Sequence, residues 1–169
     1  DLVVMALAEE QTEPSKARYT TTHFNLFRVE GGQLAEHWHS VDTPPGPDVP
    51  AANEGGPQPV TGAIGAEQLA LLDHADATVA ANKRLVFDAW REVVEGGQSD
   101  KAARYFAANY IEHDPNKRSG LKGLLEGLPK GAGVRGSLAQ PLVAMVGQGD
   151  LVVLVTGRTH PHPTRKGAS

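Results

Sequence analysis

The chain has 169 residues, with 16 basic and 20 acidic side chains and a formal net charge of -4. Charges of both signs are mixed along it, which argues against nucleic acid or a membrane surface as a partner. The absence of cysteine excludes disulfides, zinc–thiolate sites and thiol catalysis. No apolar run approaches the roughly 20 residues of a membrane span, and the length suits one ordinary domain.

The first residues give an expectation about completeness and location. The chain begins at Asp1, without Met, inside an apolar, strand-like run. We interpret the chain as a fragment of a longer protein. Because no secretory signal is visible, we expect a cytoplasmic location.

The N-terminal part, residues 1–43, is predicted to consist of strands. Residues 1–8 are an apolar run that predicts a short buried strand. Residues 19–29 are rich in Thr and aromatic side chains, which favours a second strand. Gly31-Gly32 supplies the positive φ values that a two-residue hairpin turn needs. A third strand therefore follows, to about residue 42.

The third strand ends in two histidines that flank a tryptophan, His37-Trp38-His39. Because side chains alternate along a strand, both imidazoles are expected on one face of the sheet. A regular two-residue turn pairs Asn25 with Trp38. This register predicts that His23 and Asn25 lie on the face opposite His37.

A linker is predicted at residues 44–65, where the composition changes to proline among glycine and alanine. The prolines are Pro44, Pro45, Pro47, Pro50, Pro57 and Pro59. This segment separates the N-terminal strands from the remainder of the chain.

The C-terminal part, residues 66–169, carries the helical patterns. An apolar stripe at helical spacing predicts a helix over residues 78–95, which Gly96-Gly97 ends. Two shorter helices and two further strands are predicted at residues 99–107, 119–128, 138–146 and 151–160. The last strand begins with Asp150-Leu151-Val152-Val153, a repeat of the first four residues of the chain.

The hairpin sequence Phe27-Arg28-Val29-Glu30-Gly31-Gly32-Gln33-Leu34-Ala35-Glu36-His37-Trp38 resembles the closing hairpin of SnoaL-like proteins. These are small α+β cones of the nuclear transport factor 2-like superfamily. In that family the hairpin follows three helices, whereas here the stretch that resembles the family's beginning starts at Asn82. The resemblance therefore implies a curved, mixed or antiparallel sheet wrapped around three helices, with the halves of the cone in permuted order.

Two arrangements explain this order and the repeated strand. The chain is either a permuted single cone, or the back half of one tandem cone followed by the front half of the next. The two halves close within one chain or exchange between the chains of a homodimer. The sequence leaves these alternatives open.

The resemblance assigns catalytic positions residue by residue. His39 stands where the family's polyketide cyclases have an acid–base Asp, and His37 stands where they keep a His. Tyr110-Ile111-Glu112-His113-Asp114-Pro115 resembles the family's Tyr-Ile-Gln-His-Asn-Pro segment, which implies that His113 lies at the pocket.

A second pair comes from related cones. Arg158 and His160 stand where limonene epoxide hydrolases have an Arg-x-Asp pair. In the repeated first strand these positions hold Glu9 and Gln11, and which copy lines the pocket stays open. The remaining residues expected to contact substrate are Leu26, Trp38, Trp90, Tyr110 and His160.

These residues predict an acid–base enzyme that needs no cofactor and acts on a small, largely apolar molecule. The reaction classes implied are isomerisation, cyclisation, and hydration or epoxide hydrolysis. His39 would act as the base, with His37 and His113 orienting or donating. Arg158 would stabilise developing negative charge.

The alternative is a non-catalytic ligand-binding or dimerisation module of the same fold, which the loss of both expected acids favours. In this interpretation His37 and His39 lie on the outer face of the sheet, against water or a dimer partner. His113 then only fixes the turn before Pro115. A metal site built from the three histidines is a further alternative, although no metal is expected in this superfamily.

Overall fold

A computed structural model describes residues 1–12, 16, 18–40, 49–128 and 140–157. Within these residues the chain is a mixed α+β fold, which confirms the predicted class. The sequence predicts one curved sheet, whereas the described strands form two separate antiparallel sheets. The cone shape and the permuted order stay predictions.

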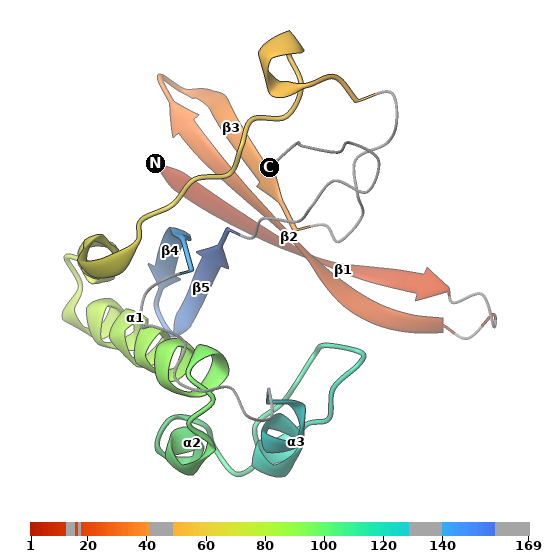
Figure 1. Cartoon of the computed structure of the whole chain (residues 1–169), viewed down its shortest axis with the longest axis vertical. Helices are drawn as coiled ribbons and strands as arrows, with labels where there is room; N and C mark the ends of the chain where they lie inside the picture. The colour runs from red at the N-terminus through yellow and green to blue at the C-terminus, as the bar shows by residue number, and fades with distance from the viewer. Residues whose placement is uncertain (13–15, 17, 41–48, 129–139, 158–169) are drawn as a thin grey trace.

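The elements follow one another as strands, helices and again strands (Figure 1). The strands are β1 (Leu2–Thr12), β2 (Arg18–Glu30), β3 (Gln33–His39), β4 (Leu142–Gln148) and β5 (Leu151–Thr156). The α-helices are α1 (Ala77–Ala89), α2 (Ala102–Tyr105) and α3 (Gly120–Gly127). The other helical segments are three 3-10 helices, η1 (Ala52–Glu54), η2 (Gly65–Leu72) and η4 (Ser99–Lys101), and one π-helical segment, η3 (Trp90–Glu95).

The first sheet has the strand order β1-β2-β3. Gly31 and Gly32 have φ values of 57° and 78°, the conformation predicted for the two-residue turn. The ladder then departs from the expected register, because Val29 pairs with Leu34 but Arg28 pairs with Glu36. One residue of β3, Ala35, is therefore left over as a bulge.

The bulge overturns the expected arrangement of the two faces. It places Asn25 opposite His39 instead of Trp38, and Leu26 opposite Trp38. Asn25 and His23 consequently share the face of His37 and do not lie on the opposite one.

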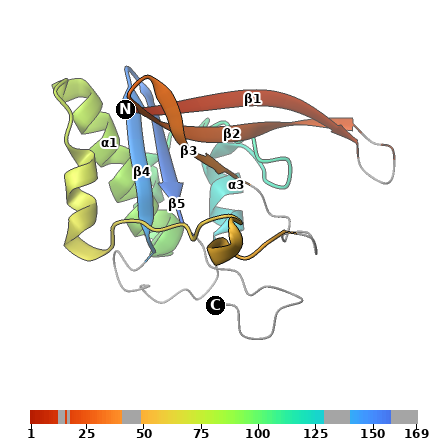
Figure 2. The same ribbon diagram turned by 90° about the horizontal axis from the view of Figure 1, so that it is seen from above.

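Strand β1 is longer and more exposed than predicted. It runs to Thr12, and the side chains of Leu2, Val3, Met5 and Leu7 are between 42% and 46% exposed. β1 is an edge strand, and the far end of the β1–β2 ribbon projects beyond the other described elements (Figures 1 and 2). The prediction of a buried first strand is wrong, because only a small part of this ribbon meets the rest of the molecule.

The long helix is confirmed near the predicted bounds. It begins after Asp76, whose carboxylate accepts backbone hydrogen bonds from Thr78 at 2.7 Å and Val79 at 3.2 Å. α1 continues directly into η3, and the chain leaves the helix at Gly97 with a φ of 63°. The departure from α-helical to π-helical geometry inside this stretch is not predicted by the apolar spacing.

The core lies between α1, η2 and the β4–β5 hairpin. Leu72, Phe87, Leu142 and Met145 are buried together there. Gly147 lets α1 approach β4 closely, since a Cβ at this position would lie 2.6 Å from Val79 Cγ1. Of the described apolar side chains in the first sheet, Leu26 is the one that is fully buried.

Two polar side chains fasten the segments around this core. Gln68 is fully buried, and its Nε2 donates to the carbonyl oxygens of Ala63 at 2.9 Å and Gln140 at 2.7 Å. The buried Lys83 donates from Nζ to the carbonyl oxygen of Asp73 at 3.0 Å. The end of the predicted linker is thereby tied to the start of β4.

Candidate functional site

A cavity of about 440 Å³ lies between the two sheets. Its lining is mainly apolar, with polar groups contributed by Asn25, His39, Ser40 and Thr156. The apolar lining residues are Val4, Phe24, Leu26, Trp38, Val60, Val143, Val152, Val153, Leu154 and Val155.

The register of the first sheet builds one wall of this cavity. Val4 pairs with Leu26, and Leu26 pairs with Trp38, so the three side chains form a row across β1, β2 and β3. Leu26 is only 4% exposed. Leu26 and Trp38, both expected to contact substrate, are therefore brought together by the shifted register.

Polar residues next to this row also belong to the cavity lining. Asn25 pairs with His39, and Ser40 follows at the end of β3, where its backbone N–H donates to the carbonyl oxygen of Phe24 at 3.4 Å. Asn25, His39 and Ser40 all line the cavity. The side chains of Asn25 and His39 belong to the face opposite Leu26 and Trp38, whereas Ser40 shares the cavity-facing side with Trp38.

The imidazoles themselves gather on the other face of the sheet. His37 stacks on Phe27 with ring centroids 4.7 Å apart, and its Nε2 lies 2.9 Å from Asn25 Oδ1. The His39 ring lies 6.1 Å from the His37 ring and 5.4 Å from the His23 ring. His37 and His39 are exposed, as the outer-face interpretation predicts.

A carboxylate stands at the end of this histidine row. Glu9 Oε2 lies 2.8 Å from His23 Nε2. The regular register predicted from the sequence placed His23 on the face opposite His37. The signal that would have found it is the bulge, since only the shifted register puts all three imidazoles on one face.

The other predicted catalytic residues are not part of this arrangement. His113 is exposed and is not among the residues that line the cavity. Its backbone N–H donates to Glu112 Oε1 at 2.9 Å, as in a residue that belongs to a turn. Arg158 and His160 lie outside the described residues.

Trp90 and Tyr110, also expected to contact substrate, line a second cavity of about 360 Å³. The Tyr110 hydroxyl donates to Glu112 Oε2 at 3.2 Å. Burial and the neighbouring Glu112 carboxylate raise the pKa of Tyr110, so its proton stays on the hydroxyl. The predicted substrate residues are therefore divided between two cavities that have no lining residue in common.

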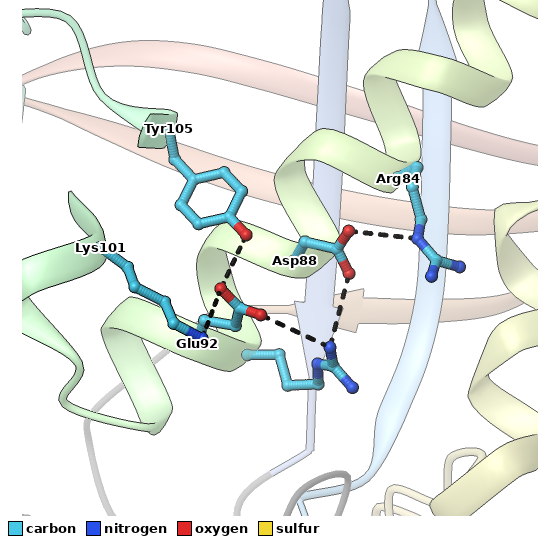
Figure 3. Close-up of polar contacts among 6 residues, drawn as sticks. Arg84, Asp88, Glu92, Lys101 and Tyr105 are labelled. Carbon is cyan, nitrogen blue, oxygen red and sulfur yellow. Dashed lines mark hydrogen bonds and ion pairs between the residues drawn. The ribbon is translucent and has the colours of Figure 1, made fainter. Parts of the chain in front are cut away.

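A network of charged side chains braces η3 against α2, and sequence reasoning missed it. Glu92 Oε2 accepts from the Tyr105 hydroxyl at 2.7 Å and lies 3.3 Å from Lys101 Nζ (Figure 3). These contacts, the Tyr105 hydrogen bond first, hold the pKa of Glu92 below its ordinary value. Arg91 lies between Glu92 and Asp88, and Asp88 also accepts from Arg84 Nε at 3.2 Å.

Metal binding finds no support in the part of the chain that the structure describes. No group of three or more His, Asp or Glu side chains in these residues is arranged to hold a metal ion. Among the same residues, no helix is both long and apolar enough to cross a membrane. Comparison of the chain with models of protein families, with curated proteins and with solved structures gives no match.

Proposed function

We propose that this chain binds a small, largely apolar molecule in the cavity between its two sheets, as a ligand-binding module of the SnoaL-like kind. The observation that carries the proposal is the row formed by Val4, Leu26 and Trp38, which faces the valines of β5 across the cavity. The volume of about 440 Å³ lies within the range of about 300–1,000 Å³ that is usual for ligand pockets.

The distribution of polar side chains on the cavity wall indicates the shape of the ligand. Ser40 shares the face of Leu26 and Trp38, while most of the lining is aliphatic or aromatic. A ligand with an apolar body and one hydroxyl or carbonyl end would match this distribution. Its polar end would exchange a hydrogen bond with water for a hydrogen bond with the Ser40 hydroxyl.

A cavity-filling substitution tests the proposal. Val153 lines the cavity, so Val153→Phe should occupy the space and weaken binding of the neutral apolar fluorophore N-phenyl-1-naphthylamine at least about tenfold. Leu151→Phe is the matched control, because Leu151 lies on the same strand but is 70% exposed and outside the cavity lining. Fluorescence titration measures both variants. Equal affinity of Val153→Phe and the unchanged chain would exclude this cavity as the binding site.

Proton transfer by His39 is the second candidate function. It rests on one observation, that His39 belongs to the cavity lining, while the His39 ring itself lies with those of His23 and His37. The binding proposal expects a small ketone incubated with the protein in D2O to be recovered without added deuterium. Deuteration next to the carbonyl that is faster with the unchanged chain than with His39→Gln would instead identify an acid–base catalyst.

A further inference from the structure

The second cavity differs from the first in the chemistry of its walls. Three aromatic side chains line it, Trp90 from η3 and Phe106 and Tyr110 from the segment after α2. The Phe106 and Tyr110 rings meet edge to face, with centroids 5.4 Å apart. Aliphatic groups of α3 complete the wall. Aromatic rings attract cations over their faces, and quaternary ammonium ligands are recognised by cages of such rings.

Two carboxylates accompany the aromatic rings. Glu95 and Glu112 both line the cavity. Lys117 also lines it, but its Nζ lies 3.1 Å from Asp114 Oδ2, so that cation already has a counter-charge. The Lys117 cation is thus compensated by Asp114, and Glu112 contributes a carboxylate to the wall.

Glu112 is held in a fixed position before any ligand arrives. Its Oε1 accepts the backbone N–H groups of His113 at 2.9 Å and Asp114 at 3.0 Å, and its Oε2 accepts the Tyr110 hydroxyl. The backbone N–H of Glu112 itself donates to Ser119 Oγ at 3.0 Å. A carboxylate oriented in this way loses little conformational entropy on binding a cation.

From this juxtaposition we infer that the second cavity binds an organic cation, a small ligand that carries a quaternary or otherwise alkylated ammonium group. Its alkyl groups would contact Trp90, Phe106 and Tyr110, and its charge would lie against Glu112. The site is separate from the one proposed between the sheets, because the two cavities share no lining residue. Failure of either proposal leaves the other standing.

The test compares two ligands of the same shape. Choline carries a trimethylammonium group, and 3,3-dimethylbutan-1-ol replaces it with an uncharged tert-butyl group. We expect calorimetric titration of the full chain to detect choline binding that is at least about tenfold tighter than binding of the alcohol. Equal binding of both ligands, or no binding of choline at millimolar concentration, would overturn the inference.

Substitutions then locate the site. Glu112→Gln keeps an oxygen for the two backbone N–H groups but removes the charge, and we expect about tenfold weaker choline binding. Glu126→Gln on α3 is the matched control, since Glu126 is exposed and does not line the cavity. Phe106→Leu keeps apolar bulk but removes a ring, so it should weaken choline binding several-fold even if the Glu112 variant proves unstable. Unchanged affinity in the folded Glu112→Gln or Phe106→Leu variant would contradict the assignment.

Discussion

Glu92 shows how one side chain can connect several elements. It lies on η3 and accepts a hydrogen bond from Tyr105 on α2, while Lys101 supplies a nearby positive charge (Figure 3). Because these contacts favour the carboxylate, the pKa of Glu92 is lower in the folded chain than its ordinary value of 4.5. Its contribution to stability is therefore complete above pH 4.5 and is lost as the pH falls through the lower, folded value.

Replacement of Glu92 by Gln should reveal this dependence. We expect Glu92→Gln to lower the free energy of unfolding at neutral pH, and we expect the difference from the unchanged chain to shrink well below pH 4.5. Urea denaturation at both pH values measures the difference directly. A difference that stays constant with pH would show that the carboxylate charge has no part in this contact. Glu67→Gln, which removes an exposed carboxylate from η2, serves as the comparison.

For the histidines, the sequence predicts which of them share a face within one strand but not which residues of the next strand join them. Strand periodicity alone predicts that His37 and His39 share a face, and their rings are 6.1 Å apart. It does not predict that the face also holds His23 and Asn25, because that depends on pairing with another strand. Pairing depends in turn on which side chains the rest of the molecule buries.

At the scale of elements, the β2–β3 hairpin shows why the register escaped prediction. A regular ladder would have placed His37 opposite Leu26 and Trp38 opposite Asn25. The bulge instead sets Trp38 opposite Leu26 and His37 opposite Phe27, so the apolar pair Leu26–Trp38 meets the cavity and His37 contacts Asn25 diagonally. Ala35 carries no distinctive signal of a bulge, whereas the Gly31-Gly32 turn was predictable because few residues tolerate positive φ.

The α1 helix gives the opposite case. Its apolar stripe and the Gly96-Gly97 stop define it well from the sequence, since both depend on neighbouring residues. The π-helical segment at its end was not predictable. It brings Trp90 and Glu95 to the second cavity and Glu92 to Tyr105. Such contacts between separate segments produce no periodic pattern in the sequence from which a π-helical segment could be predicted.

The packing of α1 on β4 yields a prediction of its own. Gly147→Ala should destabilise the fold by about 1–3 kcal/mol, because the added methyl group would lie 2.6 Å from Val79 Cγ1. Gly127→Ala is the control, since a Cβ there meets nothing within 4 Å. Its free energy of unfolding should change by less than about 0.5 kcal/mol. Chemical denaturation of both variants tests the pair, and equal effects would contradict a tight helix–strand contact at Gly147.

At the scale of the whole molecule, the buried apolar side chains are distributed unevenly. The core cluster belongs to η2, α1 and β4, whereas the three-stranded sheet contributes Leu26 and the partly buried residues around it. The cavity separates much of this sheet from β4 and β5. Local stability follows the amount of apolar surface that each part buries, so the two parts should open at different free energies.

Hydrogen exchange can measure this difference. We expect the backbone amides of β1 and β3 to exchange faster than those of α1 and β4, and a cavity ligand should slow exchange in β2 and β3. Exchange followed by mass spectrometry of peptides resolves these segments. Uniform protection across β1, α1 and β4 would indicate one cooperative unit instead.

The spare residue in β3 also bears on how this hairpin tolerates deletions. If one residue between Gly32 and Trp38 were lost, the strand could close its bulge at Ala35 and keep Trp38 opposite Leu26. The loss of a single codon there would thus leave the inner and outer side chains where they are. An inserted residue could not be absorbed by closing the bulge. The hairpin therefore tolerates shortening by one residue but not lengthening, and what shortening preserves is the pairing of Leu26 with Trp38 in the cavity wall.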